Sequence, residues 1–373
     1  MKFSLSREAL LKPLQLVIGV VERRQTLPIL SNVLLSLSDK NLSITGTDLE
    51  VEIVGLTAVS DSEEEGSVTI SARKTLDICR SLPEGATLKF SSSEGKASIQ
   101  SGKSKFMLST LPANEFPTVD EGEKSLEFNV SGKDLQKLIE STSFAMAQQD
   151  VRYYLNGMLW ELTSGQIRTV ATDGHRMALA DGKCDLALEE PLKAIVPRKG
   201  VVELQRLLDD DSVKIVIGTN HIRVIGGDYQ FTSKLVDGAY PDYDRVLPKG
   251  GDKVIQADRL ELKGAFGRAA ILSNEKYRGV RLSLSEDSLK IVANNPEQEE
   301  AQEDMEVNYK GEALEIGFNV SYLLDVFNTL EQRDIKMTLL NSNSSVLIES
   351  VSDESALYVV MPMRLKRQRY DYI

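Results

Sequence analysis

The chain has few of the residues that catalysis and metal binding use most. Its 373 residues include two cysteines and two histidines. Cys79 and Cys184 show no C-x-x-C spacing, so they indicate neither a disulfide framework nor a zinc site, and they suit a reduced compartment. No serine or cysteine stands in a nucleophile motif such as G-x-S-x-G. Gly95-Lys96 lacks the rest of a phosphate-binding loop. We therefore predict no catalytic site, no metal and no cofactor.

Long apolar runs are scarce as well. The run Leu14–Val21 follows Arg7, Glu8 and Lys12, which is typical of an amphipathic helix and not of a signal peptide. No run approaches the length that crosses a bilayer. With 41% apolar and 27% charged residues, the composition is that of a globular protein with room for two or three domains. We expect a cytoplasmic protein without a membrane partner.

Two clusters leave alternatives open. Asp173 and His175 suit either the acid–base pair of a hydrolase or a turn aspartate beside a partly buried histidine. The acidic run Glu297–Asp304 suits either a divalent cation or a solvated, partner-facing surface, and its spacing does not match the twelve-residue calcium loop. In both cases the pattern favours the second interpretation.

The clearest positive signal is a threefold internal repeat. The stretch Ile167–Ala180 alternates as a strand does and turns at Thr172-Asp173. A similar strand and turn occur at Leu42–Ile53, where Asp48 precedes Asp173 by 125 residues, and again at Leu289–Val307. A period this long suits whole small domains and not a solenoid.

Helices repeat in step with these strands. Each copy opens with a capping residue and apolar residues at helical spacing, and each has a second helix later. We expect first helices over 6–18, 131–146 and 258–272, and second helices starting near 72, 197 and 318. Strands dominate without regular βαβ alternation. We therefore predict an α+β fold of three tandem copies, each with two helices packed on antiparallel sheets, at 1–122, 123–250 and 251–373.

The net charge of −12 argues at first against nucleic acid, because such binders usually carry a basic excess. The charge is unevenly spread, however. Acidic clusters lie at Glu63–Glu65, Asp209–Asp211 and Glu297–Asp304, whereas the expected helices carry cations at helical spacing. Any one helix suits a solvated face, while the set suits a shared basic surface. These cations are Arg73, Lys74, Arg80, Lys133, Lys137, Arg198, Lys199, Arg206, Arg259, Lys263 and Arg268.

Several blocks in fixed order carry a family resemblance. They are TLPILSNVLL (26–35), QDVRYYLNGML (149–159), ATDGHR (171–176), VPRKGV (196–201), FTSKLVDG (231–238), ILSNEKYRGVRL (271–282), ANNPEQEEA (293–301) and YVVMPMRL (358–365). From Met1 to Leu365 the chain resembles the bacterial sliding clamps, the beta subunits of DNA polymerase III.

The resemblance implies a DNA-clamp fold and a head-to-tail homodimer, whose six modules form a ring around duplex DNA. Such a ring acts as a processivity factor in chromosomal replication. It is placed by an ATP-driven clamp loader, tethers the replicative polymerase and other DNA-processing proteins, and contacts DNA independently of sequence in the cytoplasm, at the nucleoid. Simple geometry agrees. Treated as spheres roughly 35 Å across, three copies enclose a hole of about 5 Å and six enclose about 35 Å. Duplex DNA is roughly 20 Å wide, so two chains are needed.

The resemblance also assigns residues. Loops at the ring face would touch DNA through Arg24, Gln149, Tyr153 and Tyr154, together with the helix cations Arg73, Lys74, Arg80, Arg198, Lys199 and Arg206. Without the family, the two tyrosines suit a core equally well. A partner-peptide cleft would consist of Leu155, Thr172, Gly174, His175, Arg176, Met177, Pro241, Arg245, Val246, Leu247, Tyr322, Val359, Val360, Met361, Pro362, Met363 and Arg364. For Val359–Met363 a buried last strand is the alternative.

For the dimer interface, the family pairs a basic and apolar strand with an acidic region. The residues are Lys96, Lys103, Lys105, Phe106 and Leu108 on an expected edge strand, and Ile271, Leu272, Glu297, Glu299, Glu300, Glu303 and Asp304. The lysines also suit protection of an exposed edge against aggregation.

One departure from the family is the tail Lys366–Ile373, which continues past the usual end of the pattern. It suits either a segment that occupies a cleft or an unstructured end. Two rival functions remain at this point: a hydrolase that uses Asp173 and His175, and a protein-binding scaffold that never touches DNA.

Overall fold

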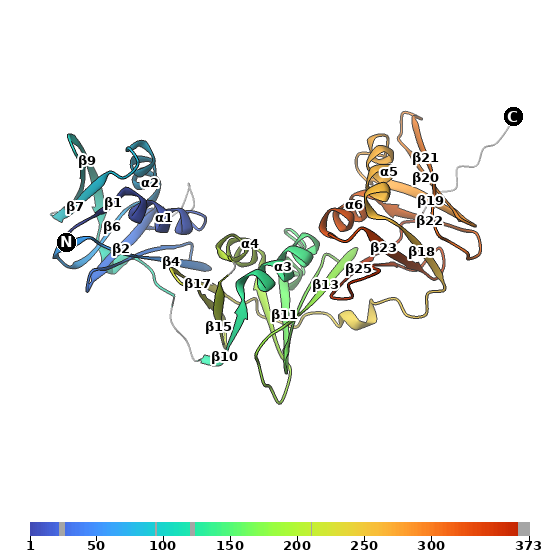
Figure 1. The fold of residues 1–373 in the computed structure, drawn as a ribbon, viewed down its shortest axis with the longest axis horizontal. Coiled ribbons are helices and arrows are strands. Elements are labelled where there is room, and N and C mark those ends of the chain that lie inside the picture. Colours follow the sequence, from blue (N-terminus) through green and yellow to red (C-terminus); the bar gives the residue numbers. More distant parts are fainter. Residues whose placement is uncertain (22–26, 94, 120–123, 210, 365–373) are drawn as a thin grey trace. The chain divides into compact units, whose positions relative to one another are not determined.

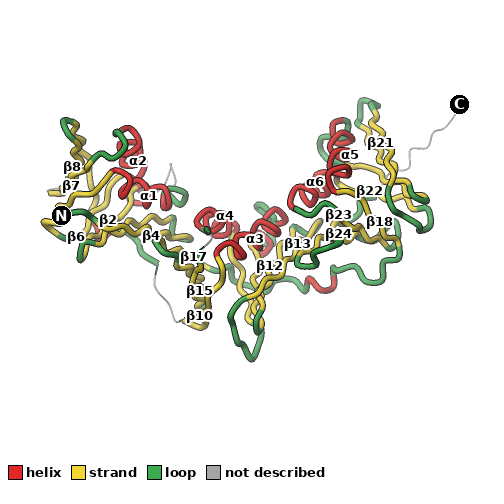
Figure 2. The backbone as a smooth tube through the Cα atoms, viewed as in Figure 1, coloured by secondary structure: helices red, strands yellow, loops and turns green. Residues whose placement is uncertain are grey.

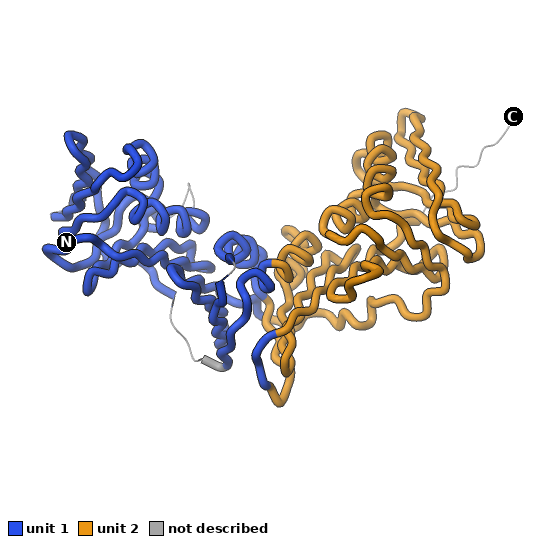
Figure 3. The backbone as a smooth tube through the Cα atoms, in the orientation of Figure 1, with its two compact units in different colours: residues 1–136, 184–187, 196–237 blue, residues 137–183, 188–195, 238–373 orange. Residues whose placement is uncertain are grey.

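The computed structural model describes residues 1–21, 27–93, 95–119, 124–209 and 211–364. Arg24 and the tail Lys366–Ile373 lie outside these residues. The chain forms two compact units (Figure 3), residues 1–136, 184–187 and 196–237 in unit 1, and residues 137–183, 188–195 and 238–373 in unit 2.

One sheet runs through the whole of unit 1. It has thirteen strands in the order β10-β15-β16-β17-β4-β3-β2-β6-β9-β8-β7-β1-β5, and the neighbours pair antiparallel. The strands are β1 (Lys2–Ser6), β2 (Asn32–Ser38), β3 (Asn41–Thr47), β4 (Val51–Ala58), β5 (Asp61–Glu64), β6 (Gly66–Ser71), β7 (Thr87–Ser93), β8 (Lys96–Ser101), β9 (Ser104–Leu111), β10 (Lys124–Ser131), β15 (Ser212–Gly218), β16 (His221–Ile225) and β17 (Tyr229–Lys234).

Three helices pack on one side of this sheet (Figure 1): α1 (Arg7–Val17), α2 (Ala72–Ser81) and α4 (Arg198–Leu207). Helix α1 lies on β4 and β3 and also packs against α2, while α4 contacts β17. The 3-10 helices are η1 (Pro28–Ser31) and η2 (Ala113–Glu115). The helices bury their apolar positions, such as Leu10, Leu14 and Val17 of α1, as the helical spacing predicted.

Unit 2 contains two antiparallel sheets (Figure 2). The larger has the order β14-β11-β12-β13-β25-β24-β23-β18, and the smaller β21-β20-β19-β22. The larger consists of β14 (Leu192–Pro197), whose last two residues belong to unit 1, β11 (Gly157–Thr163), β12 (Gln166–Thr172), β13 (Arg176–Lys183), β25 (Ala356–Val360), β24 (Val346–Ser350), β23 (Asp334–Leu339) and β18 (Lys253–Asp258). The smaller consists of β21 (Glu300–Glu306), β20 (Ser288–Asn294), β19 (Gly279–Ser285) and β22 (Leu314–Asn319).

The helices here are α3 (Gly132–Thr142), whose first turn belongs to unit 1, α5 (Arg259–Ile271) and α6 (Val320–Thr329). Helices α5 and α6 pack against each other, and α6 also contacts β25. Three 3-10 turns complete the unit: η3 (Ser143–Ala145), η4 (Tyr153–Asn156) and η5 (Tyr243–Arg245). The predicted α+β class with antiparallel sheets is confirmed.

The predicted caps hold the first helices. The Ser6 hydroxyl accepts from the Ala9 amide at 3.2 Å, and the Ser131 hydroxyl accepts from the Asp134 amide at 3.3 Å. The Asp258 carboxylate accepts from the amides of Leu260 and Glu261. These bonds satisfy amides that have no partner inside the helix.

Sheet pairing crosses the expected divisions between copies. In unit 1, β4 of copy one pairs with β17 of copy two, and we call this the first junction. In unit 2, β13 of copy two pairs with β25 of copy three, and we call this the second junction. Copy two is thus shared between the two units, and the division at 1–122, 123–250 and 251–373 stays a prediction.

Candidate functional site

The β12–β13 turn forms the centre of the candidate cleft. The Thr172 hydroxyl donates to the Arg176 carbonyl at 2.6 Å and accepts from the Gly174 amide at 3.1 Å. One oxygen of Asp173 accepts from the amides of His175 and Arg176, at 2.8 and 3.0 Å. Gly174 has a φ of 87°, a conformation that favours glycine. The predicted turn chemistry is confirmed.

The same geometry bears on the hydrolase alternative. The second oxygen of Asp173 pairs with the Arg176 guanidinium at 3.1 Å, so both carboxylate oxygens serve the turn. The His175 ring is exposed and stacks on Tyr322, with centroids 6.3 Å apart and planes inclined by 16°. Imidazole and carboxylate are engaged by different partners, which favours the turn interpretation over an acid–base pair.

Arg176 fastens this turn to α6 and η3. Its guanidinium pairs with Asp325 of α6 and donates to the Phe144 carbonyl at 2.9 Å. It also lies 4.7 Å from the centroid of Tyr322 and 5.3 Å from that of Phe144. A flat, delocalised cation suits such stacking between two rings. Arg176, His175 and Tyr322 therefore form one connected wall.

The apolar floor lies on one face of the sheet. Thr172 is opposite Met177, and Met177 is opposite Val359, so the three side chains project from the same face. Met177, Val359 and also Leu155 of η4 are buried. Beyond β25 the Met361 amide donates to the His175 carbonyl at 2.9 Å, and the Met361 side chain is 37% exposed. The buried Val359 and Val360 thus adjoin an accessible methionine.

Segment 241–247 forms a second wall, which we call the cleft wall. Pro241 and Arg245 are exposed, and Val246 and Leu247 are half-buried. Two tyrosines that the residue analysis missed anchor it. Tyr243 is buried, and burial raises the pKa of Tyr240, which lies beside Thr172 and Asp173. The aromatic-proline turn Tyr240-Pro241, which repeats Phe116-Pro117, was the available signal.

The remaining cleft residues border a pocket of about 670 Å³. The Met363 amide donates to the Gly317 carbonyl at 2.7 Å, which places Pro362, Met363 and Arg364 beside β22. Ser342 and Asn343 line the other side. The volume is that of a small-molecule or peptide site. Unit 2 thus holds all residues assigned to the cleft.

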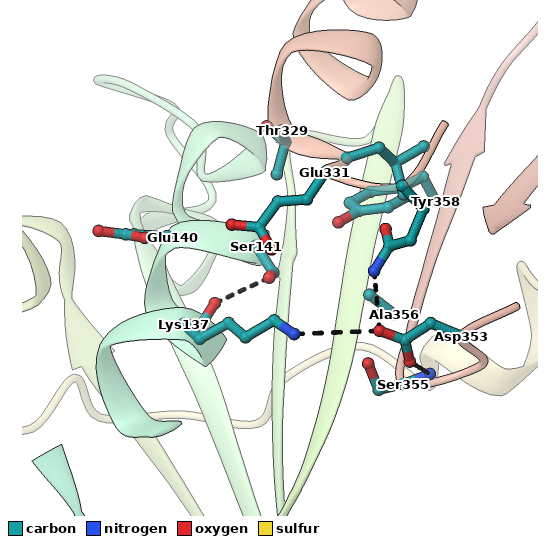
Figure 4. Close-up of a pocket in the computed structure, with 11 residues that line it drawn as sticks. Lys137, Glu140, Ser141, Thr329, Glu331, Asp353, Ser355, Ala356 and Tyr358 are labelled. Atoms are coloured by element: carbon teal, nitrogen blue, oxygen red, sulfur yellow. Dashed lines mark hydrogen bonds and ion pairs between the residues drawn. The ribbon is translucent and has the colours of Figure 1, made fainter. Parts of the chain in front are cut away.

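A smaller pocket lies between α3, α6 and the segment before β25 (Figure 4). Lys137 and Asp353 form an ion pair at 3.9 Å across it, and Gln332 donates to the same carboxylate at 2.9 Å. Its volume is about 50 Å³, which suits a few water molecules. We interpret it as packing at the second junction.

The candidate DNA contacts fall into two classes. Lys74 and Arg80 of α2 are exposed. By contrast, Lys199 pairs with Asp48, and Arg206 donates to the carbonyls of Gln15 and Leu16 at 2.9 and 2.6 Å. A guanidinium at that place caps the end of α1 and opposes the helix dipole.

The other candidate DNA contacts differ in their exposure and local contacts. Arg73 reaches the Val21 carbonyl at 3.4 Å, and Arg198 is half-buried. Tyr153 is 57% exposed, Tyr154 is half-buried, and their rings meet edge to face, so neither is a core residue. Gln149 has a φ of 55° and precedes Asp150, whose pKa the Arg152 guanidinium lowers to about 2. Arg24 lies outside the described residues.

The candidate dimer residues lie on strands β8, β9 and β21, in the turns that precede β9 and β21, and at the end of α5. Ile271, at the end of α5, is 75% exposed, and Leu272 is half-buried. Strand β21 ends the smaller sheet and alternates exposed and half-buried residues, so Glu300 and Asp304 share a face and Glu303 points away to pair with Arg268. Glu297 and Glu299 occupy the turn before β21.

One expectation about the basic strand is corrected. Lys105, Phe106 and Leu108 lie on β9, but Lys96 lies on β8, between β7 and β9, and Lys103 lies in the turn. The hairpin turn at Gly102 places the lysines on neighbouring strands, which the residue spacing did not reveal.

Two further observations concern residues 1–21, 27–93, 95–119, 124–209 and 211–364. No helix among them is long and apolar enough to cross a membrane. No group of three acidic, histidine or cysteine side chains in that part of the chain could hold a metal ion.

Comparison with known proteins gives consistent matches. Residues 1–120, 129–242 and 244–364 match the models of the N-terminal, central and C-terminal domains of the DNA polymerase III beta subunit. The beta sliding clamp of Pseudomonas aeruginosa is 57% identical over 367 residues, and that of Escherichia coli is 54% identical over 370. Each match covers 98% of this chain and 100% of the relative.

Solved structures agree. The crystal structure of the DNA polymerase III subunit beta from Pseudomonas aeruginosa matches with a TM-score of 0.96 and 57% identity. The Caulobacter crescentus pol III beta matches with a TM-score of 0.93 and 37% identity. Both cover 98% of this chain and all of the other. The Pseudomonas aeruginosa clamp has also been solved bound to griselimycin. The chain therefore belongs to the DNA polymerase III beta subunit family, the DNA sliding clamps of replication.

Proposed function

We propose that two copies of this chain close head to tail into a ring around duplex DNA, which carries no catalysis of its own. A clamp loader places the ring, and short peptides of the replicative polymerase and other DNA-processing proteins bind its clefts. The observation that carries the proposal is a repeated strand pairing. Copies one and two, and copies two and three, are joined by the same kind of junction within the chain. Copy three of one chain and copy one of another could form a third junction of that kind.

Strand register defines that third junction. The β3–β4, β12–β13 and β20–β21 turns are closed by equivalent pairs, Thr47–Glu52, Thr172–Met177 and Asn294–Glu300. Glu52 pairs with Thr232 at the first junction, and Met177 pairs with Val359 at the second. Met107 precedes Thr232 by 125 residues. Glu300 of one copy should therefore pair with Met107 of the partner subunit, joining β21 to β9.

Both strands have an edge available for that pairing. Strand β21 is the last in its sheet. Strand β9 pairs with β8 along one side, but in the described residues it pairs with β6 on the other side only through Thr110 and Leu111, so the first half of that side has no strand partner. Such edges pair readily with another strand unless something covers them.

Apolar burial points to the same junction. Phe231 and Tyr358, which precede Thr232 and Val359, are 0% and 1% exposed. Their counterpart Phe106 is only half-buried. At the second junction the rings of Tyr358 and Phe144 pack together, with their centroids 5.9 Å apart. Counted from the helix caps Ser131 and Asp258, the counterpart of Phe144 is the exposed Ile271, which would cover the partner's Phe106 and remove it from water.

Charge then fixes the orientation. In this register Asp304 lies opposite Lys103 of the partner subunit, and Gln302 lies opposite the partner's Lys105. The acidic β21 meets basic β8 and β9, whereas two like strands would repel each other. Charges at the rim of an interface favour one arrangement more than they add affinity.

The basic helix faces then meet DNA. Exposed cations such as Lys74 and Arg80 supply phosphate contacts that do not depend on sequence and weaken with salt. The affinity of the ring for DNA can be low, which permits sliding, because closure around the duplex and not tight binding keeps the ring on DNA. The apolar floor, with Met177 and Met361, suits varied short peptides.

The test compares retention on circular and linearised DNA after loading, at moderate salt. A closed ring stays on the circle and leaves from free ends. Equal loss from both forms would show ordinary binding and would overturn the proposal. An I271D variant serves as the control, because a ring that cannot close should be lost from both.

A further inference from the structure

We infer that Tyr243 is a positioning residue for the candidate cleft: its hydroxyl ties the cleft wall, residues 241–247, to a chain of ion pairs on the sheet, and this tie sets the affinity of the cleft. The inference rests on the peptide cleft of the proposed function. Tyr243 does not itself face the peptide, since it is 5% exposed.

The wall has few other attachments within the described residues. Its regular structure is the three-residue turn η5. Asp242 and Arg245 pair at 2.8 Å, but their side chains are 55% and 84% exposed. Exposed pairs of this kind contribute little. The buried ring of Tyr243 is therefore the main anchor within residues 241–247, in addition to the flanking Tyr240.

The Tyr243 hydroxyl joins two charged groups. It donates to the Glu161 carboxylate of β11 and accepts from the Arg168 guanidinium of β12 at 3.4 Å. Arg168 makes a two-point pair with Asp181 of β13, at 2.6 and 2.8 Å. Lys193 of β14 pairs with Glu161 at 3.1 Å and lies 5.8 Å from the Tyr243 ring. Four adjacent strands thus contribute one charged side chain each.

This chain of charges lies on the same face as the cleft floor. Arg168 is opposite Asp181, and Thr172 is opposite Met177, on the same two strands. Positions 168 and 172, and likewise 177 and 181, are separated by an even number of residues, so all four side chains project from one face. Next to the wall, Tyr240 lies beside Thr172 and Asp173 of the β12–β13 turn, so the segment joins the Tyr243 anchor to the turn at the centre of the candidate cleft.

The chemistry explains why the anchor is strong and specific. A hydroxyl that donates to a carboxylate makes a charge-assisted bond, shorter and stronger than a neutral one. The two-point pair with Asp181 fixes the guanidinium that meets the hydroxyl from the other side. A wall held in one place is already arranged for a ligand, whereas a loose wall must be ordered during binding, which lowers affinity.

The test uses the full-length protein, with griselimycin, the compound bound by the Pseudomonas aeruginosa relative, as the probe that we propose for the cleft. Tyr243→Phe removes only the hydroxyl. We expect affinity, measured by calorimetry, to fall about fivefold to tenfold, the net effect of one ordinary hydrogen bond, because the lost bond acts on the ligand only through the position of the wall. Tyr309→Phe is the matched control, because Tyr309 is another buried tyrosine of unit 2, and its hydroxyl donates to the Glu312 carbonyl. It should leave affinity within about twofold of the parent.

A double-mutant cycle separates positioning from general damage. In a V246A/L247A background the wall no longer makes its contacts, so Tyr243→Phe should add less than about twofold. Glu161→Gln, which keeps an acceptor for the hydroxyl, should retain more affinity than Glu161→Leu. The inference is overturned if the losses of affinity from Tyr243→Phe and V246A/L247A simply add, or if Tyr243→Phe alone does not change the affinity. Neither result would contradict the proposed cleft. If V246A/L247A itself has no effect, the proposed cleft fails, and the inference fails with it.

Discussion

The first and second junctions share a backbone design and differ in chemistry. In each, a hairpin of one copy pairs with the last strand of the next. The turn at Thr47-Asp48 repeats the bonds of Thr172-Asp173: Asp48 accepts from the amides of Glu50 and Val51, at 2.9 and 2.7 Å. The backbone alone therefore does not make a cleft.

The side chains decide the difference. Where the second junction has the apolar Met177, the first has Glu52, which is 6% exposed and accepts from the Val119 amide at 3.1 Å. Asp48 is tied to Lys199, and the turn carries Leu49 where the other has Gly174. The first junction is filled with polar contacts of its own, which agrees with the proposal that partner peptides bind at the second junction and not at the first.

The largest expected effect comes from the third junction. Ile271→Asp would bury a charge against the partner's Phe106, and we expect the dimer to weaken at least about 100-fold. Analytical ultracentrifugation measures this. Val151→Asp is the control, because Val151 is 94% exposed and lies outside the proposed interface. A dimer dissociation constant that is unchanged in I271D would contradict the proposed third junction.

A swap at the turns separates architecture from binding. Gly174→Leu copies Leu49, whose φ of 79° shows that the fold accepts leucine there. A Cβ at Gly174 would approach the Arg152 guanidinium to 3.1 Å. We expect about 1 kcal/mol of lost stability and a tenfold or greater loss of griselimycin affinity. Leu49→Gly should change stability by a similar amount or less and leave binding as it was. Equal effects on binding would contradict the division between the junctions.

The helix cations should divide into two groups. The double variant Lys74→Glu with Arg80→Glu should impair loading and change Tm little. The slope of log binding constant against log salt concentration should fall by the equivalent of about two phosphate contacts. Arg206→Ala should lower Tm by about 2–4 °C through lost capping of α1. Scanning calorimetry beside a loading assay tests both. A double charge reversal that loads normally would count against the basic surface.

The smallest effect concerns Glu52. Burial raises the pKa of Glu52, while the Val119 amide and Arg223 act in the opposite direction. A carboxyl group with a raised folded pKa favours the native state at pH values below its unfolded pKa, and this advantage is lost as pH rises through the folded pKa. The parent should therefore lose stability relative to Glu52→Gln as pH rises above the ordinary glutamate pKa of about 4.3. Melting curves across that rise in pH should diverge by about 2 °C or less; a constant difference would show that Glu52 does not titrate there.

Much of the fold followed from local pattern. The caps Ser6, Ser131 and Asp258 and the turn at Asp173 act within a few residues of chain, so they were predictable without the structure. The family resemblance named the cleft residues, and the structure places all of them in unit 2. What was missed depends on strands far apart in sequence.

Three examples show the limit. The pairing of Arg168 with Asp181 and Tyr243 joins three segments, and no period in the sequence marks it. Arg206 had the spacing of a solvated cation, yet it caps a helix nearly 200 residues earlier in the chain. Lys96 proved to lie on an interior strand because strand order within a sheet is a tertiary property.

The central claim is that the third junction repeats the register of the first two, and disulfide cross-linking tests it most directly. In a C184S background, E300C and M107C would face each other across two copies, at a Cα separation that a disulfide can span. The account predicts efficient formation of covalent dimers under mild oxidation. A301C with M107C, whose side chains would project from opposite faces, should give few. Equal yields from both pairs, or none from the first, would contradict the register and with it the ring.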